Sequence, residues 1–279
     1  MVSAWRTARF NLHLDRPLVM GIVNATPDSF SDGGRHATVS NALRHCEQLL
    51  KDGADILDIG GESTRPGSTV VPVEEELART LPVIRAAGLL GVPLSIDTYK
   101  PQVMQAALDT GADIVNDIWA LRQPGARQAV AAHGSCGVCL MHMHGQPATM
   151  QWVPMEGDAL PQVLTFLNHA AEQLQALGVE KSRIVVDPGI GFGKTLDQNF
   201  ALLARQSELL QLGYPLLAGW SRKSSLGVVT GGLAADARML PSVAAAVLAV
   251  EHGARIVRVH DVRETVQALA VWGAMAKQR

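Results

Sequence analysis

Short hydrophobic runs alternate with longer amphipathic segments along the chain. The runs are rich in Val, Ile and Leu, which favours β-strands. They predict strands at 18–24, 54–59, 93–97, 112–116, 137–142, 183–187, 215–220 and 255–259. Apolar residues at helical spacing between them predict helices at 39–51, 73–87, 100–109, 124–133, 159–177, 198–211, 238–252 and 262–276. Strands separated by helices indicate βα units and a parallel sheet.

Residues at the junctions agree with these boundaries. Pro101 and Pro124 stand where a first helical turn is expected, a position that tolerates proline, and Asp197 is placed to cap the helix that follows it. Glycine after a helix fits the left-handed conformation that ends it. Such glycines precede predicted strands at Gly53, Gly111, Gly178 and Gly253.

Eight βα units in 279 residues predict an α/β fold, a (β/α)8 TIM barrel in which residues 1–279 form a single domain. Barrels of this kind typically need about 250 residues. An open doubly wound sheet is the main alternative. Against it, no Gly-x-Gly-x-x-Gly opens an early βα turn, and the glycine run 187–194 lacks the phosphate-loop pattern. A buried helix remains possible for any single run, but not for eight in step.

Composition describes an ordinary globular chain, with 47% hydrophobic and 18% charged residues. The net charge of −2 gives no overall basic field for nucleic acid or an anionic membrane. The N-terminal residues resemble no secretion signal, and no apolar run reaches membrane-spanning length. We therefore expect a cytoplasmic protein with reduced thiols.

The spacing of two cysteines is typical of metal or redox sites. Cys136-Gly-Val-Cys139 is followed by His142 and His144. Residues three apart on a strand point to opposite faces, however, and no second cysteine pair is present. We therefore favour structural thiols over a zinc site, and strand-end polar residues over metal ligation by the two histidines.

Polar side chains end several of the predicted strands. Asp97, Asn116, Asp187 and Lys223 follow the third, fourth, sixth and seventh runs. Together they offer two carboxylates, an amide and an ammonium, which suit an amino-oxo heterocycle such as a pterin or guanine. For any one of these residues alone, a strand-end cap or a helix N-cap is the favoured interpretation. Four of them at matching strand ends favour a binding site.

Two polar loops follow the first and second strands. The first, residues 24–34, is glycine-ended and contains Phe30, an aromatic residue among polar ones that suggests a closing lid. The second, residues 60–67, places Arg65 beside Pro66, where it would meet an anion. A solvated loop and an ordinary surface ion pair are the alternatives.

The last strand ends in Arg258-Val-His260. Residues two apart on a strand share a face, so these two side chains form a candidate anion site where barrels commonly bind phosphate. The alternative is that Arg258 pairs with Asp261 or Glu264.

At these residues the chain resembles the dihydropteroate synthase family of pterin-binding barrels. The resemblance runs from about residue 18 to about residue 265. Its main motifs are Met20-Gly-Ile-Val-Asn-Ala-Thr-Pro-Asp-Ser-Phe-Ser-Asp-Gly-Gly34, Asp58-Ile-Gly-Gly-Glu-Ser-Thr-Arg-Pro-Gly67, Asp187-Pro-Gly-Ile-Gly-Phe-Gly-Lys194 and Ser221-Arg-Lys-Ser224.

The resemblance implies a transferase of folate biosynthesis that joins 4-aminobenzoate to 6-hydroxymethyl-7,8-dihydropterin diphosphate, releasing 7,8-dihydropteroate and diphosphate. It also implies Mg²⁺, a homodimer, and competitive inhibition by sulfonamides. By position, pterin binding falls to Thr64, Asp97, Asn116, Asp187 and Lys223. Diphosphate binding falls to Asn24, Arg65, Arg258 and His260, with Asn24 also the metal ligand. The 4-aminobenzoate pocket falls to Phe30, Pro66, Phe192, Arg222 and Ser224, and the catalytic roles to Asp97, Lys223, Asn24 and Arg65.

Two departures from the family pattern stand out. Ala25 replaces a usual valine, and Arg238-Met-Leu-Pro-Ser-Val243 replaces a usual Gly-Ser/Thr-Leu-Ala after the arginine. Pro241 fits the first turn of a helix, so we expect the second change to affect helix packing or the dimer face. The alternative functions are a pterin-binding methyltransferase of the same fold and a non-catalytic pterin-binding paralogue. A plain anion-binding barrel is disfavoured by the four strand-end residues.

Overall fold

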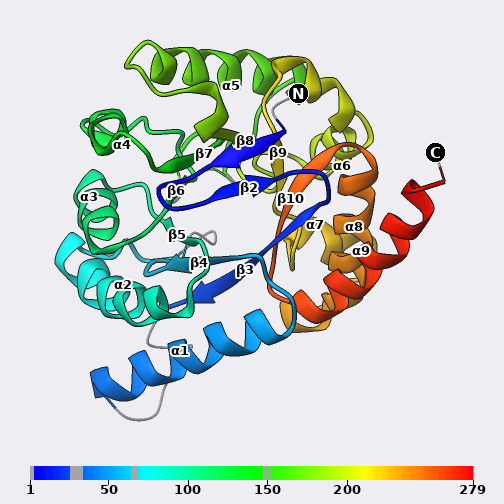
Figure 1. Cartoon of the computed structure of the whole chain (residues 1–279). Coiled ribbons are helices and arrows are strands. Elements are labelled where there is room, and N and C mark those ends of the chain that lie inside the picture. The colour runs from blue at the N-terminus through cyan, green and yellow to red at the C-terminus, as the bar shows by residue number, and fades with distance from the viewer. Residues whose placement is uncertain (1–2, 26–33, 64–67, 147–149, 151, 279) are drawn as a thin grey trace.

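Eight parallel strands close into a barrel, with helices around its outside (Figure 1). The computed structural model describes residues 3–25, 34–63, 68–146, 150 and 152–278. The barrel strands are β3 (Leu18–Asn24), β4 (Ile56–Gly60), β5 (Leu94–Asp97), β6 (Ile114–Asp117), β7 (Gly137–Met141), β8 (Ile184–Asp187), β9 (Leu216–Ala218) and β10 (Ala254–Val259). Each pairs with the next in chain order, and β10 pairs with both β9 and β3, which closes the barrel.

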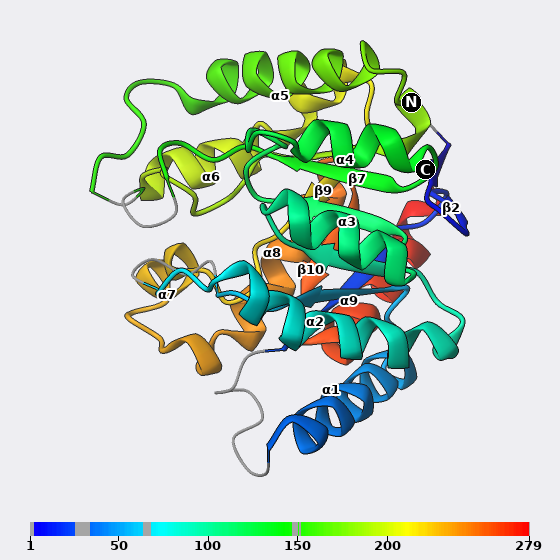
Figure 2. The ribbon, with the colours of Figure 1, turned by 90° about the vertical axis from the view of Figure 1, so that its left-hand side faces the viewer.

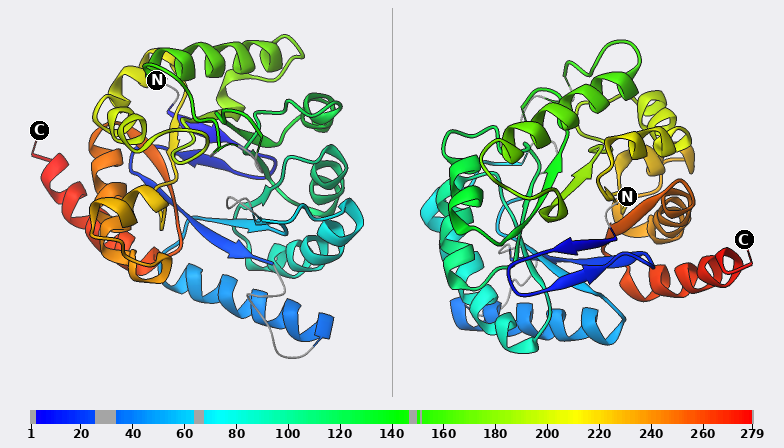
Figure 3. Two further views of the ribbon diagram at one scale, coloured as in Figure 1. Left: turned by 180° about the vertical axis from the view of Figure 1, so that it is seen from behind. Right: turned by 45° about the horizontal axis from the view of Figure 1, so that its top comes forward.

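The helices lie outside the strands, as the two further views make plain (Figure 3). They are α1 (Gly34–Lys51), α2 (Val73–Ala87), α3 (Pro101–Thr110), α4 (Ala126–His133), α5 (Ala159–Gln175), α6 (Leu196–Ala204), α7 (Ser224–Val229), α8 (Met239–Glu251) and α9 (Val262–Ala276). The predicted (β/α)8 barrel is confirmed, and each predicted strand is present with small shifts at its ends. Two helices differ more: α1 begins five residues before its predicted start, and the predicted helix 198–211 is α6 only to Ala204, followed by a 3-10 helix at Gln206–Leu212. The short helix α7 was not predicted.

The junction residues were predicted with mixed success. Pro101 is the first residue of α3, and Pro241 lies in the first turn of α8. The cap of α6 is Thr195 rather than Asp197: its side chain accepts from the backbone N–H of Gln198, whose own side chain accepts from Thr195 in return. The predicted cap by Asp197 was therefore wrong by two residues. The expected left-handed conformation is present at Gly53, Gly111, Gly178 and Gly253.

A hairpin that the periodicity did not predict closes the amino-terminal end of the barrel. Its strands β1 (Ala4–Arg6) and β2 (Asn11–His13) pair antiparallel, and α7 lies at the other end of the molecule (Figure 2). Trp5 is completely buried and donates from its indole N–H to the carbonyl of Arg183 at 2.9 Å. It completes an inner apolar core with residues of the barrel strands, among them Met20, Ile56, Ile114, Cys139, Val185, Leu217 and Ile256.

Alternation along the strands separates this inner core from a larger core between barrel and helices. Cys139 points inward, while Cys136 packs in the outer core and its sulfur lies 3.6 Å from the carbonyl of Val130. The two thiols are thus on opposite faces, as their spacing predicted. Cys46 is also buried, and all three are free. None of the helices in the described part of the chain is long and apolar enough to cross a membrane.

Candidate active site at the carboxyl ends of the strands

The inward face of the barrel changes character one layer above the apolar core. On five of the strands, the next side chain that period-two alternation turns to the interior is polar or charged. These side chains are Asp58 of β4, Asp97 of β5, Asn116 of β6, Asp187 of β8 and Arg258 of β10. Asp97 and Asn116 are register partners on neighbouring strands. The structure therefore brings four of the predicted residues into one layer and adds Asp58.

Arg258 joins the acidic residues of this layer. Its Nε donates to Oδ2 of Asp58 at 2.6 Å, and one terminal nitrogen donates to Oδ2 of Asp97 at 2.6 Å. Burial alone would lower the pKa of Arg258, but the two carboxylates raise it above its usual value, so the guanidinium stays charged. The alternative partners Asp261 and Glu264 were wrong, because the Arg258 side chain points into the barrel.

Two carboxylate oxygens in this layer are buried without a hydrogen-bond partner among the described residues. They are Oδ1 of Asp58 and Oδ1 of Asp97. An unpaired buried acceptor is costly, and at a functional site it marks where a ligand donor belongs. Burial raises the pKa of Asp97 to about 7, with Arg258 lowering it and the nearby acids Asp58, Glu76 and Asp117 raising it further.

The glycine-rich loop after β8 is fixed at both ends. Oδ1 of Asp187 accepts from the N–H of Gly189 at 2.7 Å. Gly189 has φ +68°, and a Cβ there would lie 1.8 Å from the carbonyl oxygen of His142, so only glycine fits. Lys194 is buried and its ammonium reaches the carbonyl of Gly189 at 2.8 Å and Nδ1 of His142 at 2.9 Å. Burial lowers the pKa of Lys194 to about 7.

Burial also raises the pKa of Asp187, while the Gly189 N–H and the charges of Lys223, Lys194 and Arg258 lower it. The bracing role of Lys194 was not predicted. Its place at the end of the quoted glycine motif was the available signal.

Lys223 and Phe192 meet across the site. The ammonium of Lys223 lies 4.0 Å from the centre of the Phe192 ring, a cation–π contact. Lys223 directly precedes α7, whose first residue, Ser224, is exposed. Two residues predicted for adjoining pterin and 4-aminobenzoate pockets therefore touch.

Arg222 and His260 belong to a neighbouring network. Arg222 donates to both oxygens of Asp261, at 2.6 and 3.2 Å, and its backbone N–H donates to Oγ of Ser242 at 2.8 Å. Nδ1 of His260 lies 2.9 Å from Oγ of Ser221. Ser242 lies within the segment that departs from the family pattern, so this segment contacts the backbone of a predicted site residue.

The loop residues are described only at their edges. Asn24 is the exposed last residue of β3, at the same end of the barrel as Asp97 and Asp187. The predicted site residues Phe30, Thr64, Arg65 and Pro66 lie outside the described residues.

A buried ionic cluster that the sequence did not predict joins Glu62, in the second loop, to Val71, four residues after its end. Lys100 forms ion pairs with Glu62 and Glu76 and donates to the carbonyl of Val71 at 2.7 Å. Glu62 also accepts from the backbone of Val71 at 3.2 Å and from the hydroxyl of Tyr99 at 3.0 Å. Glu62 and Val71 are thus tied together around the segment that contains Arg65.

The two histidines that follow β7, His142 and His144, belong to no group of possible metal ligands in the described part of the chain. His142 is buried, its ring packs edge-on against Phe166, and its Nδ1 faces the ammonium of Lys194. Burial and the charges of Lys194 and Arg122 lower the pKa of His142 to about 2, so it is a neutral acceptor. Within the described ranges, no group of three or more His, Cys, Asp or Glu residues is arranged to hold a metal ion.

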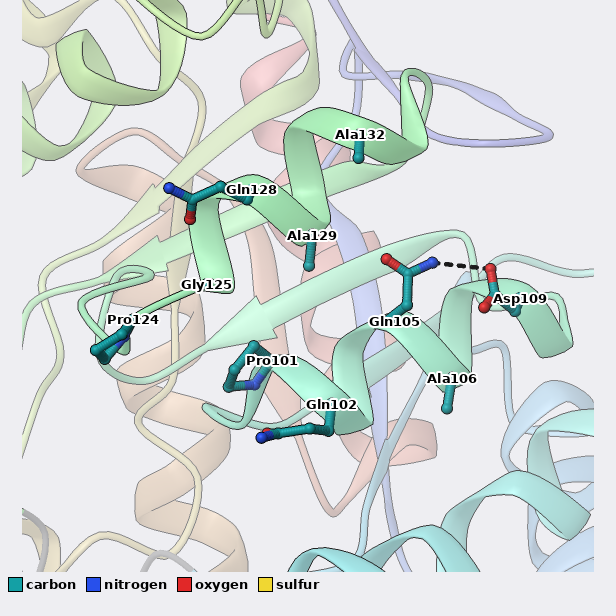
Figure 4. A pocket seen from close by; sticks show the side chains of 10 residues that line it. All are labelled: Pro101, Gln102, Gln105, Ala106, Asp109, Pro124, Gly125, Gln128, Ala129 and Ala132. Carbon is teal, nitrogen blue, oxygen red and sulfur yellow. Dashed lines mark hydrogen bonds between the residues drawn. The ribbon is translucent and has the colours of Figure 1, made fainter.

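A separate groove lies on the outside of the barrel, between α3 and α4 (Figure 4). Its lining is mainly glutamine, alanine and proline, and Gln105 donates to Asp109 at 2.9 Å. With one carboxylate and no cation in this lining, it offers little chemistry beside the strand-end layer.

Comparison with known proteins agrees with this geometry. Residues 20–260 match the family model described as pterin binding enzyme. A dihydropteroate synthase from Neisseria meningitidis serogroup C is 50% identical over 274 residues, covering 97% of each chain. The chain belongs to the dihydropteroate synthase family. The predicted activity, a transferase of folate biosynthesis, is confirmed at this level.

Solved structures of dihydropteroate synthases share the whole fold. The enzyme from Burkholderia cenocepacia, in complex with 7,8-dihydropteroate, is 52% identical with a TM-score of 0.91, covering 99% of each chain. The enzyme from Yersinia pestis, in a sulfonamide drug complex, is 45% identical with a TM-score of 0.92, covering 98% of this chain and 99% of that one.

Proposed function

We propose that this chain condenses 6-hydroxymethyl-7,8-dihydropterin diphosphate with 4-aminobenzoate at the carboxyl ends of its barrel strands. The observation that carries the proposal is the charged layer of Asp58, Asp97, Asn116, Asp187 and Arg258, in which two buried carboxylate oxygens have no hydrogen-bond partner in the part of the chain that the structure describes. A flat heterocycle rich in N–H groups supplies the missing donors.

The pterin ring is held by residues of this layer. Asp97 and Asp187 accept hydrogen bonds from ring N–H groups, Asn116 contributes an amide, and Lys223 donates to a ring oxygen or nitrogen. Thr64 contacts the same ring from the second loop. The apolar side chains around this end of the barrel, including Met141 and Phe192, pack in one buried cluster and exclude water from the site.

The diphosphate lies toward the loops, where Asn24, Arg65, Arg258 and His260 meet it. Arg258 stabilises the negative charge of the diphosphate from the interior of the barrel, because its guanidinium remains charged between Asp58 and Asp97. Asn24 suits Mg²⁺, because an exposed amide oxygen at the mouth can join phosphate oxygens and water around a hard cation. When bound, Mg²⁺ neutralises charge on the departing diphosphate.

The reaction needs positioning and electrostatics rather than a nucleophilic residue. The bond from the methylene carbon to the diphosphate oxygen breaks, and diphosphate leaves with the electron pair. The positive charge left on the pterin is stabilised by ionised Asp97. The amine of 4-aminobenzoate then attacks the methylene carbon and loses a proton. Lys223 holds the pterin ring in place, and Asn24 and Arg65 stabilise the departing diphosphate.

4-Aminobenzoate occupies a neighbouring pocket that Phe192 shares with the pterin. Its other walls are Phe30, Pro66, Arg222 and Ser224. A sulfonamide presents the same amine and ring, so it competes for this pocket, consistent with the sulfonamide complex of the Yersinia pestis relative.

A homodimer is proposed from exposed apolar side chains on α7, α8 and α9. Leu240 and Val271 are each 73% exposed, and Val228, Leu248 and Met275 are also exposed. Apolar side chains so placed are typical of an interface. Leu240→Asp should convert the dimer to a monomer in light scattering, while the equally charged change Leu89→Asp, on the exposed 3-10 turn after α2, leaves it dimeric. A wild-type monomer would refute the dimer. A cytoplasmic location remains a prediction of the sequence.

The decisive assay is diphosphate release that depends on both substrates. We expect release only with the pterin diphosphate and 4-aminobenzoate together, and loss of release in excess chelator. Asn24→Ala should raise the Mg²⁺ concentration needed for half-maximal rate, and should weaken Mg²⁺-dependent binding of diphosphate in calorimetry. Release with the pterin substrate alone, or full activity in chelator, would contradict the proposal.

A further inference from the structure

Asp58 is the member of the charged layer to which the sequence motifs gave no role. It is fully buried on β4, and its Oδ2 accepts two hydrogen bonds, from Nε of Arg258 at 2.6 Å and from Nδ2 of Asn116 at 3.2 Å. Its Oδ1 has no partner among the described residues. One carboxylate therefore contacts two of the residues proposed to bind substrate.

The contact with Asn116 determines which end of that amide faces the ligand. Oxygen and nitrogen lie at opposite ends of a side-chain amide, so turning Nδ2 toward Asp58 turns Oδ1 away from it. An ionised aspartate only accepts hydrogen bonds, and it therefore selects this orientation over the flipped one. Asn116 then presents an acceptor, matching the unpaired acceptor on Asp97.

The contact with Arg258 fixes a cation that also reaches Asp97. The guanidinium is planar, and its two bonds to Asp58 and Asp97 hold it in one orientation across the barrel. Without Asp58, Arg258 has a single carboxylate partner and is free to rotate about it. The position of the positive charge of Arg258 relative to Asp97 then changes.

We propose that Asp58 is a positioning residue that fixes the Asn116 amide and the Arg258 guanidinium, and so makes this layer an acceptor surface for ring N–H groups. This inference rests on the proposed pterin site and deepens it. A purely structural carboxylate would support the barrel without setting ring recognition.

The test compares Asp58→Asn with Asp113→Asn. Asp113 is also fully buried and pairs with an arginine, Arg9, at 2.7 Å, but at the amino-terminal end of the barrel. Pterin affinity is measured by calorimetry, which requires no turnover, and kcat is followed against pH. We expect Asp58→Asn to weaken pterin binding about 10- to 100-fold, since a polar partner is lost in a desolvated site.

The pH profile separates positioning from mere support. The charged groups acting on Asp97 are Arg258, Asp58, Glu76 and Asp117. Removing the negative charge of Asp58 makes ionisation of Asp97 easier, so the acid limb of kcat should move to lower pH. Asp113→Asn should lower the unfolding temperature without moving this limb or the pterin affinity.

Near-wild-type pterin binding in Asp58→Asn, or weakened binding with an unmoved acid limb, would overturn the inference. If Asp58→Asn does not fold, Asp58→Ser carries the same test, because it leaves room for water beside Arg258. Diphosphate release by the wild type tests the reaction separately. An active wild type with an indifferent Asp58→Asn refutes the role of Asp58 alone.

Discussion

The two ends of the barrel interior are built by the same strands and differ completely in chemistry. At the amino-terminal end, Met20, Ile56 and Ile256 pack under Trp5 in a closed apolar core. One layer further along, Asp58 and Arg258 occupy the same inward face of β4 and β10. The first layer lowers the free energy of the folded state, whereas the buried charges of the second layer raise it.

Function in this fold resides at the charged end of the barrel interior. The side chains of the apolar layer are closely packed, so a substitution there lowers the stability of the fold. In the charged layer, two buried carboxylate oxygens have no partner among the described residues, so a ligand that donates hydrogen bonds to them stabilises this layer most. Variants at the two ends should therefore separate stability from activity.

The largest effect is expected at the closed end. Trp5→Ala removes a fully buried indole and its hydrogen bond to Arg183, and should lower the free energy of unfolding by about 3–5 kcal/mol. Denaturant unfolding measures the loss, and kcat of the remaining folded protein should be unchanged. Trp152→Ala, at a tryptophan that is 79% exposed, is the control and should change neither. A large fall in kcat for Trp5→Ala would mean that the two ends are coupled.

Asp97→Asn tests the open end. Loss of the charge that stabilises the pterin cation should lower kcat roughly 100-fold, as for other lost transition-state partners. The folded protein should be at least as stable at pH 8, because a buried negative charge has been removed. Steady-state kinetics and unfolding curves on one preparation give both quantities. If Asp97→Asn lost stability and kept its kcat, the assignment of stability to the apolar layer and of activity to the charged layer would be wrong.

Asp187→Asn and Lys223→Ala should each weaken pterin binding by about 1–3 kcal/mol while the fold remains intact. Calorimetric titration measures the affinity. Lys181→Ala removes an exposed lysine on the outside of the barrel, beside the Tyr214 ring, and serves as the matched control. Wild-type affinity in both site variants would remove these residues from the pterin site.

The smallest expected effect is that ionisation of Asp97 makes stability fall and activity rise as the pH increases. Burial raises the pKa of Asp97 to about 7, above its unfolded value. Its contribution to stability is therefore fully present below the unfolded pKa and is lost as pH rises through about 7, whereas activity needs the ionised form and rises over the same range. The free energy of unfolding is measured at pH 5 and at pH 8 for Asp97→Asn and for the wild type. The stability of Asp97→Asn relative to the wild type should be greater at pH 8 than at pH 5. An equal difference at both pH values would contradict this.

Local pattern was enough to predict the barrel. The period of two in the strands and the helical spacing between them depend only on neighbouring residues, and they predicted the fold class and the eight barrel strands. The short helix α7 and the end of α6 at Ala204 were not predicted. The hairpin β1–β2 was missed because each of its strands has only three residues. Such short strands are stabilised by packing on the barrel end, which no local pattern contains.

The candidate site was predicted in its residue types and only partly in its contacts. Asp97, Asn116 and Asp187 were identified because each ends a strand, and parallel strand ends meet at one edge of the barrel. Closure of the barrel decided the partners. It brought Arg258 of the last strand to Asp58 and Asp97, far away in sequence, rather than to the nearby Asp261, which pairs with Arg222 instead. Sequence determines which side chains face inward, and only tertiary structure determines which of them share a proton, a charge or a hydrogen bond.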